Sequence, residues 1–357
     1  MSAAPEGSAL AETTPRQRAD NPARAEVPTR EPVTALSIAL RLLSAGPIVI
    51  LVVLGGILSL TVPAFLSTRN LSNILAQTAV ISVVAMGQHL VILTRGIDLS
   101  VGSNLALASV AGALTYQATG SALLTILAML ASGALVGSVN GAVYVYGRLP
   151  HPFVITLATL SIARGVALEL AHGRAIPGMP DLITFIGGGD LLGIPVSTFV
   201  VAGVGGLIVL MARAMVWGRW TYAVGGKPEA ALRMGIPVDK VLLSTYVISG
   251  LCAGIGAVIL SGRTGAGSPL LGNLLELDTI AAVIIGGASF LGGRGHIGHA
   301  LVGAVMIGVI RNALNLLNVD VFYQLIAIGV VIVLAVEADV LRNYLESRVR
   351  VLRAAKQ

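Results

Sequence analysis

Charge is almost absent from a long stretch in the first half of the chain. From Asn70 through Gly147, Arg95 and Asp98 are the only Asp, Glu, Lys or Arg residues. The whole chain of 357 residues is 55% hydrophobic and 11% charged, whereas a soluble domain has about 25% charged residues. So few charges cannot cover a water-facing surface. The sequence therefore predicts an all-α polytopic membrane protein, since backbone groups at membrane depth must be paired within helices.

The apolar residues fall into ten segments that are long enough, or nearly so, to be transmembrane helices. These segments cover residues 45–66, 71–94, 100–118, 121–146, 153–171, 192–213, 243–262, 275–290, 296–317 and 321–337. We expect residues 1–40, which are rich in proline and mixed charge, to form a disordered tail. Residues 41–340 are expected to form the transmembrane domain, and residues 341–357 a basic tail.

Lysine and arginine are distributed unequally between the two sides of the membrane. If both termini lie inside the cell, 18 of these residues fall on the inner side and 3 on the outer side. The positive-inside rule therefore predicts that both tails and the loop 214–242 are cytoplasmic. The same rule accounts for the net charge of +6 without a nucleic-acid partner.

Ten segments divide into two sets of five, and the odd number inverts the second set relative to the first, as in many transporters.

Glycines at spacings of four also predict how helices pack. Gly133, Gly137 and Gly141 form one such series, and Gly250 and Gly254 form another. Both series predict flat faces on which helices approach closely.

The loop WGRWTYAVGGKPEAALRMGIPVDKV, residues 217–241, contains the signals of a short helix. Pro228 suits the first helical position and Gly235 suits a left-handed cap. The pattern predicts a helix from Pro228 to Met234, with Ala230 and Ala231 on its surface. Such a helix either docks into a groove on another protein or simply connects two membrane segments.

Arg95 and Asp98 lie between glycines in the stretch VILTRGIDLSVGSNLALA. At the cytoplasmic end of the second and third segments, Asp98 together with Ser100 can cap the first amides of the third segment. In that case neither charge needs to be buried. The alternative is a gating hinge that uses Gly96 and Gly102.

Four stretches, in order along the chain, carry a family resemblance. They are LVILTRGIDLSVGSNLALASV, LPHPFVITLATLSIARGVAL, GRWTYAVGGKPEAALRMGI and LDTIAAVIIGGASFLGGRGHIGHALVGA. Together they resemble the membrane-spanning permease of bacterial ribose-type (monosaccharide) ABC importers. The resemblance implies a vitamin B12 permease-like (type II ABC importer) fold and a dimer of ten-helix subunits in the bacterial cytoplasmic membrane. It also implies cytoplasmic ATPases that bind ATP and Mg, and an external sugar-binding protein, periplasmic or lipid-anchored.

The resemblance also assigns a role to the short helix. In the family, the loop carrying PEAALRMGI is the coupling helix that enters a cleft on the ATPase. The residues that match it here are Pro228, Glu229, Ala230, Ala231, Arg233, Gly235 and Ile236. The chain departs from the family at three positions, because the family usually has Gly at Arg95, Asn at Lys227 and Pro at His151.

Several other functions fit the sequence poorly. The three lysines, Lys227, Lys240 and Lys356, do not lie in a phosphate-binding loop, so we expect this chain to bind no nucleotide itself. The acidic residues lie near segment ends, which disfavours an ion-coupled secondary carrier. His296 and His299 lack the ligands that would complete a metal site, and no acid/base constellation indicates a membrane-embedded enzyme.

Uncharged polar residues inside the segments are candidates to line a path for a hydroxylated solute. These are Gln88, Asn140, Thr156, Thr159, Asn312 and Asn315. Arg164 and Arg311 are the deepest charges, and each anchors a neighbouring helix, faces a water-filled path or extends to an interface. We therefore expect a non-catalytic permease subunit that imports a monosaccharide by alternating access driven by ATP on partner subunits. A nucleoside, a branched-chain amino acid or a signalling sugar is the alternative substrate.

Overall fold

The computed structural model describes residues 35–354, which are mostly helical. The helices are α1 (Ala35–Thr61), α2 (Thr68–Leu93), α3 (Val101–Thr119), α4 (Ala122–Tyr146), α5 (Phe153–Leu170), α6 (Asp181–Gly188), α7 (Val196–Ala214), α8 (Val216–Gly226), α9 (Pro228–Arg233), α10 (Val238–Thr264), α11 (Leu275–Ile285), α12 (Ile297–Leu316) and α13 (Val321–Ala354). Two antiparallel pairs of two-residue strands join β1 (Ile176–Pro177) to β4 (Ala266–Gly267) and β2 (Asp190–Leu191) to β3 (Ile194–Pro195). Most of the tail predicted over residues 1–40 lies outside the described residues.

Each of the ten predicted apolar segments overlaps one helix in the described part of the chain. These helices are α1 to α5, α7 and α10 to α13. Six of them, α2, α4, α5, α7, α10 and α12, are long and apolar enough to cross a membrane. The chain is therefore a helical multi-pass membrane protein, as its composition predicts.

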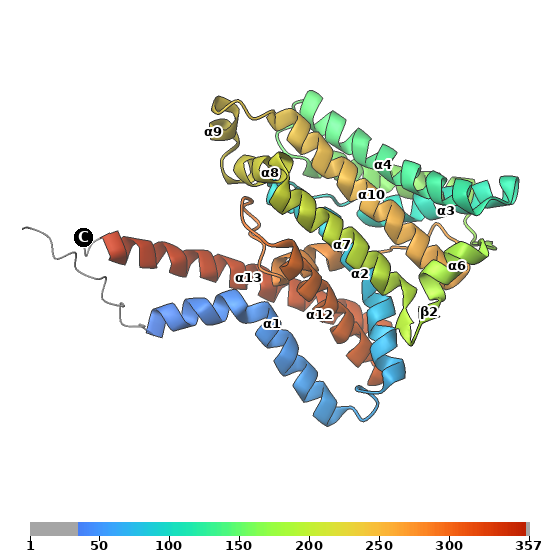
Figure 1. Ribbon diagram of the computed structural model, residues 1–357, viewed down its shortest axis with the longest axis horizontal. Coiled ribbons are helices and arrows are strands. Elements are labelled where there is room, and N and C mark those ends of the chain that lie inside the picture. The colour runs from blue at the N-terminus through green and yellow to red at the C-terminus, as the bar shows by residue number, and fades with distance from the viewer. Residues whose placement is uncertain (1–34, 355–357) are drawn as a thin grey trace, which may run out of the picture. The chain divides into compact units, whose positions relative to one another are not determined.

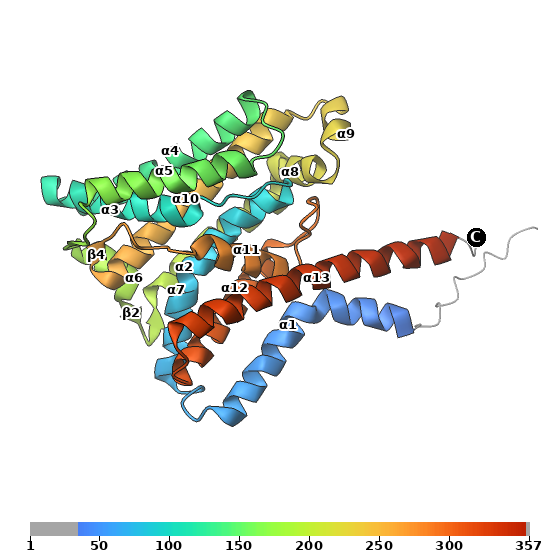
Figure 2. The same cartoon turned by 180° about the vertical axis from the view of Figure 1, so that it is seen from behind.

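The helix α2 lies at the centre of the helical bundle and packs against α10 and α12. Of its most apolar stretch, 83% is buried inside the protein, compared with 22% for α5. Figure 2 shows α5 on the outside of the bundle, beside α3 and α4. The apolar face of α5 is therefore turned toward lipid or another chain, whereas α2 is enclosed by protein.

Glycines bring α4 and α10 into backbone contact. A Cβ atom at Gly133 would meet backbone atoms of Gly250 and Gly254, and a Cβ at Gly137 would meet backbone atoms of Tyr246 and Gly250. Side chains at these positions would hold the two helices apart. The close helix approach predicted from the glycine spacing is confirmed.

The two ends of the bundle differ. Figure 1 shows α8 and α9 beside the start of α10, and α6 with β2 beside the end of α10. At that second end α6 packs on the last turns of α10, where Gly187 and Gly262 each face backbone atoms of the other helix. We describe the candidate functional residues in three places: the end that carries α8 and α9, the core of the bundle, and the end that carries α6.

Candidate functional site

The short helix α9 is stopped by a backbone motif that depends on one glycine. The N–H of Gly235 donates to the carbonyl of Leu232 at 3.0 Å, and the N–H of Ile236 donates to the carbonyl of Ala231 at 3.1 Å. These two bonds form a Schellman motif, which requires a left-handed residue after the helix. Gly235 has φ 78°, so its predicted left-handed conformation is confirmed.

One face of α9 is buried and the other is exposed. Ala231 is 4% exposed and packs with Val224 of α8 and Val241 of α10, so the prediction that it lies on the surface is wrong. Its side chain points back toward the neighbouring helices and holds α9 in place. The residues that α9 and its cap expose are Glu229, Ala230, Leu232, Arg233 and Met234, while Pro228 and Ile236 are partly buried.

Two large apolar side chains were missing from the predicted coupling surface. Leu232 is 66% exposed and Met234 is 82% exposed. Leu232 lies in α9 and Met234 directly follows it, and α9 projects from the end of the bundle in Figure 1. Exposed apolar side chains next to Glu229 and Arg233 make this helix a candidate docking element, because such a patch is covered when a partner binds.

Asp98 lies in the core, at the centre of a network of hydrogen bonds. Its side chain is 1% exposed. Its Oδ1 atom accepts from the backbone N–H of Ser100 at 3.0 Å and from the Ser100 hydroxyl at 2.6 Å, and its Oδ2 accepts from the Ser249 hydroxyl at 3.1 Å. Burial raises the pKa of Asp98, and the bonds from Ser100 and Ser249 oppose that rise.

The expectation that this carboxylate needs no burial is therefore wrong. The segment 94–100 between α2 and α3 lies against α4, α5 and α10, so its carboxylate is enclosed by protein. Asp98 binds the amide and the hydroxyl of Ser100, the residue before α3, but the Ser100 side chain does not cap the helix. The predicted capping of the first amides of α3 is therefore not found.

Three of the predicted path residues surround this segment. Gln88 in α2 exchanges two hydrogen bonds with the backbone of Asp98, at 3.1 and 3.2 Å, in the amide orientation that satisfies both groups. Asn140 in α4 donates to the Ser100 hydroxyl at 2.8 Å, and Thr156 in α5 donates to the carbonyl of Ile97 at 3.2 Å. Residues from α2, α4, α5 and α10 thus converge on one turn. We refer to Gln88, Asp98, Ser100, Asn140 and Ser249 as the Asp98 network.

The glycines that flank the network permit close approach. A Cβ at Gly96 would lie 2.5 Å from the hydroxyl of Tyr246, and a Cβ at Gly102 would collide with the carbonyl of Gly272 and the carboxylate of Glu276. Tyr246 and Ser249 were not predicted as site residues. Their sequence signal is weak: Tyr246 and Ser249 are polar residues three apart in α10, next to Gly250.

Arg95 occupies a left-handed turn and reaches another helix. Its φ is 68°, a conformation that glycine adopts more readily. Its Nε donates to the carbonyl of Gly225 at 2.6 Å, and its guanidinium also donates to the carbonyl of Gly226, at the end of α8. The positive φ explains why a glycine suits this position, and the side chain gives this chain a contact that glycine cannot make.

The remaining predicted path residues are held elsewhere. Arg164 donates to the carbonyls of Pro269 and Leu271 ahead of α11, and Arg311 forms an ion pair with Asp278 at 2.7 Å. Asn312 exchanges amide hydrogen bonds with Asn70, Asn315 accepts from Gln324, and Thr159 is buried in α5. Asn312 and Asn315 therefore join α12 to α2 and α13 and take no part in the Asp98 network.

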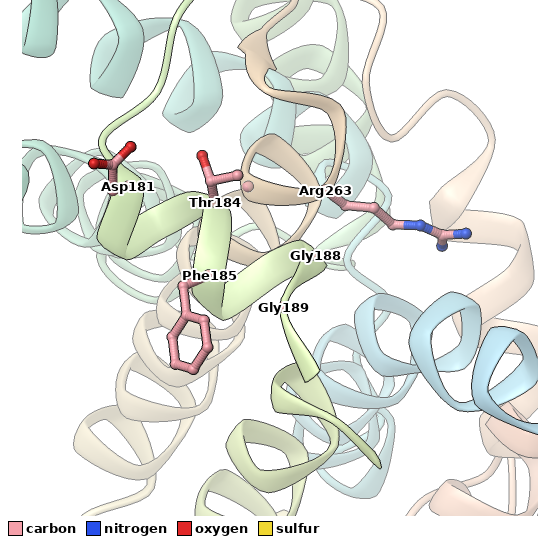
Figure 3. Close-up of a pocket in the computed structure, with 7 residues that line it drawn as sticks. Asp181, Thr184, Phe185, Gly188, Gly189 and Arg263 are labelled. Atoms are coloured by element: carbon pink, nitrogen blue, oxygen red, sulfur yellow. The ribbon is translucent and has the colours of Figure 1, made fainter. Parts of the chain in front are cut away.

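A hollow of about 490 Å³ lies at the opposite end of the bundle from α9. It is lined by residues of α6 and the end of α10, and Figure 3 shows Asp181, Phe185 and Arg263 pointing in different directions. The side chains do not converge on a common point. Among the side chains that the structure describes, no group of three or more His, Cys, Asp or Glu is placed to hold a metal ion.

Comparison with known proteins identifies relatives along most of the chain. Residues 70–336 match the family described as branched-chain amino acid transport system / permease component. A ribose import permease protein of Haemophilus influenzae is 37% identical over 84% of this chain and 92% of its own length. A ribose import permease protein of Bacillus subtilis is 40% identical over 82% and 92%, and a D-allose transport system permease protein of Escherichia coli is 38% identical over 79% and 86%. No solved structure gives a significant match.

Proposed function

Because the chain belongs to the branched-chain amino acid transport system / permease component family, we propose that it is the membrane-spanning permease subunit of an ABC importer for a monosaccharide. The observation that carries this proposal is the identity of 37% and 40% with two ribose import permeases, over 92% of the length of each. The D-allose permease widens the expected substrate class from ribose to small sugars in general.

The arrangement in the membrane is part of the proposal. All ten apolar helices cross or enter the membrane as two inverted halves in a vitamin B12 permease-like fold, with both termini in the cytoplasm of a bacterial cell. The glycine contacts between α4 and α10 and the enclosed position of α2 support a permanently packed core. Two copies of such a subunit, with α5 on an outer face, would line one sugar path between them.

Energy is supplied by partner chains. Cytoplasmic ATPase subunits bind ATP and Mg, and an external binding protein delivers the sugar. The exposed Leu232 and Met234 of α9 support its role as the coupling helix. When the ATPase subunits move, α9 moves with them, and the helices packed behind it open the path alternately to the two sides.

A reconstitution experiment tests this proposal. We expect the chain, assembled with its ATPase and binding-protein partners in liposomes, to import ribose only when ATP is present. We expect the chain alone to show neither ATP hydrolysis nor uptake. Ribose accumulation by the chain alone under a proton or sodium gradient would establish a secondary carrier instead.

The substrate is tested with the same liposomes. Uptake of a nucleoside or a branched-chain amino acid in preference to ribose and allose would overturn the sugar assignment. That result would leave the importer assignment intact.

A further inference from the structure

Arg95 lies in the segment that carries Asp98 and contacts the end of α8, which leads into α9. Its backbone lies three residues before Asp98, and its guanidinium binds the last carbonyls of α8, directly before Lys227 and α9. We propose that Arg95 is a positioning residue that links α9 to the Asp98 network, so that a movement of α9 is passed to the buried segment 94–100. This inference rests on the proposed function of α9 as the coupling helix.

The surroundings of Arg95 form a tight junction of three chain segments. The N–H of Gly293 donates to the carbonyl of Leu93 at 2.8 Å, which joins the end of α2 to the loop 286–296. A Cβ at Gly225 would collide with the carbonyl of Leu93, and a Cβ at Gly292 would collide with the side chain of Arg95. The end of α2, the end of α8 and the loop 286–296 therefore approach at backbone distance, and the Arg95 side chain lies in this junction.

The chemistry of the contact favours arginine in particular. The last carbonyls of a helix have no partner within the helix and carry a partial negative charge. The planar guanidinium of arginine presents several N–H donors in a fixed fork, so it can bind two neighbouring carbonyls at once. A lysine has a single ammonium group on a flexible chain and cannot reproduce this fork.

The left-handed backbone conformation of Arg95 indicates that its side-chain contact with α8 has a role. A left-handed conformation is unfavourable for an L-amino acid and favourable for glycine. A residue that only had to complete this turn would be best as glycine. The side chain compensates for that disadvantage through its two bonds to α8, which hold the segment 94–100 and α8 at a fixed spacing.

The first test measures how firmly α9 is held against the bundle, in the full chain without any partner. In a Cys252→Ala background, spin labels at Leu232→Cys on α9 and Tyr146→Cys at the end of α4 report the distance between α9 and the bundle. We expect a narrow distance distribution with Arg95, a broader one in Arg95→Gly, and an intermediate one in Arg95→Lys. Glycine suits the left-handed turn, so the broadening would report the loss of the side-chain bonds and not added backbone strain.

Arg148→Gly is the matched control. Arg148 is also exposed and left-handed, with φ 52°, at the end of another helix, but in the described part of the chain it forms no hydrogen bond or ion pair with α8 or α9. We expect its distance distribution to equal that of the parent. An unchanged distribution in Arg95→Gly would overturn the proposed link.

The second test measures the consequence in the assembled importer. We expect the amount of ribose imported per ATP hydrolysed to fall about threefold or more in Arg95→Gly, because links between two moving elements change coupling by factors of this order. Arg148→Gly should keep the parent ratio. A parent ratio in Arg95→Gly, despite a broadened distance distribution, would overturn the transmission role.

The two tests separate this inference from the proposed function. If the parent assembly imported no ribose with ATP, the proposed function and the transmission role would both be overturned. The link between Arg95 and α8 would still be decided by the distance measurement, which needs no partner.

Discussion

Backbone conformation at single residues determines how α9 is held. Gly235 with φ 78° ends the helix through two backbone hydrogen bonds, and Arg95 with φ 68° binds the helix that precedes it. An L-amino acid in this conformation costs about 1 to 2 kcal/mol relative to its preferred region. Gly235 avoids this cost, whereas at Arg95 the bonds to the end of α8 offset it.

Replacing Gly235 by valine should weaken the end of α9. A β-branched side chain fits a left-handed residue poorly, so we expect a local cost of about 1 to 2 kcal/mol. The variant should still insert in the membrane, while sugar uptake and stimulation of the partner ATPase fall together in proteoliposomes. Gly120→Val is the control, since Gly120 has φ 65° with open space around it at the end of α3. Equal loss of ATPase stimulation in both variants would contradict a specific role for α9.

Replacing Asp98 by alanine should destabilise the core. The Ser100 amide and the hydroxyls of Ser100 and Ser249 would lose their acceptor inside the protein, which costs about 1 to 3 kcal/mol for each polar group left unpaired. We expect a clear fall in the melting temperature in detergent and a smaller fall for Asp98→Asn, which keeps one acceptor. Asp190→Ala, at an exposed strand position, should melt like the parent. A parent-like melting temperature for Asp98→Ala would show that the network adds nothing to stability.

At the scale of elements, the contact between α4 and α10 depends on backbone touching backbone. Gly133→Ala would place a methyl group against the carbonyl of Gly250 and the amide of Gly254, and overpacking of this kind costs about 1 to 3 kcal/mol. We expect less folded protein by size-exclusion chromatography and a lower melting temperature. Gly203→Ala in α7 is the control, because no atom lies within 4 Å of the added Cβ. It should be neutral or slightly stabilising, and a similar loss in both variants would refute the packing argument.

The sequence predicts where the helices of this protein lie along the chain better than it predicts which residues they bury. Apolar segments and glycine spacing identify the long helices and the contact of α4 with α10, because both depend on local composition and period. The signals around Pro228 and Gly235 locate α9 for the same reason. In contrast, α8 escapes prediction, since its sequence VWGRWTYAVGG mixes glycines with polar residues.

The inward course of the segment 94–100 could not be predicted from local pattern. Asp98 and Ser100 form the same capping pattern whether the turn lies at a surface or in the core. The carboxylate accepts from Ser100 beside it and from Ser249 of α10. Gln88 of α2 binds the Asp98 backbone, and Asn140 of α4 binds the Ser100 hydroxyl. These three helices are brought to the turn by the fold, which the local pattern does not show. The burial of Ala231 escapes prediction similarly, because it depends on where α8 and α10 lie.

At the scale of the whole molecule, the charge distribution predicts the orientation in the membrane. The count of 18 Lys and Arg residues against 3 predicts that position 227 lies in the cytoplasm and position 174 outside. In a Cys252→Ala background, we expect an impermeant thiol reagent added to intact cells to label Arg174→Cys and to spare Lys227→Cys. Opening the cells should make position 227 reactive, and the reverse pattern would invert the proposed topology.

The enclosed position of α2 has a consequence for the order in which the helices are synthesised and packed. A ribosome delivers α2 to the membrane long before α10 and α12, which supply its protein surroundings in the finished structure. Asp98, the partner of Gln88, follows α2 within a few residues and is made soon after it. The helices α10 and α12, which enclose α2 in the finished protein, are made much later. The central helix is therefore among the first to be inserted and among the last to be enclosed. α2 therefore lacks the contact with α12 until synthesis has passed residue 316.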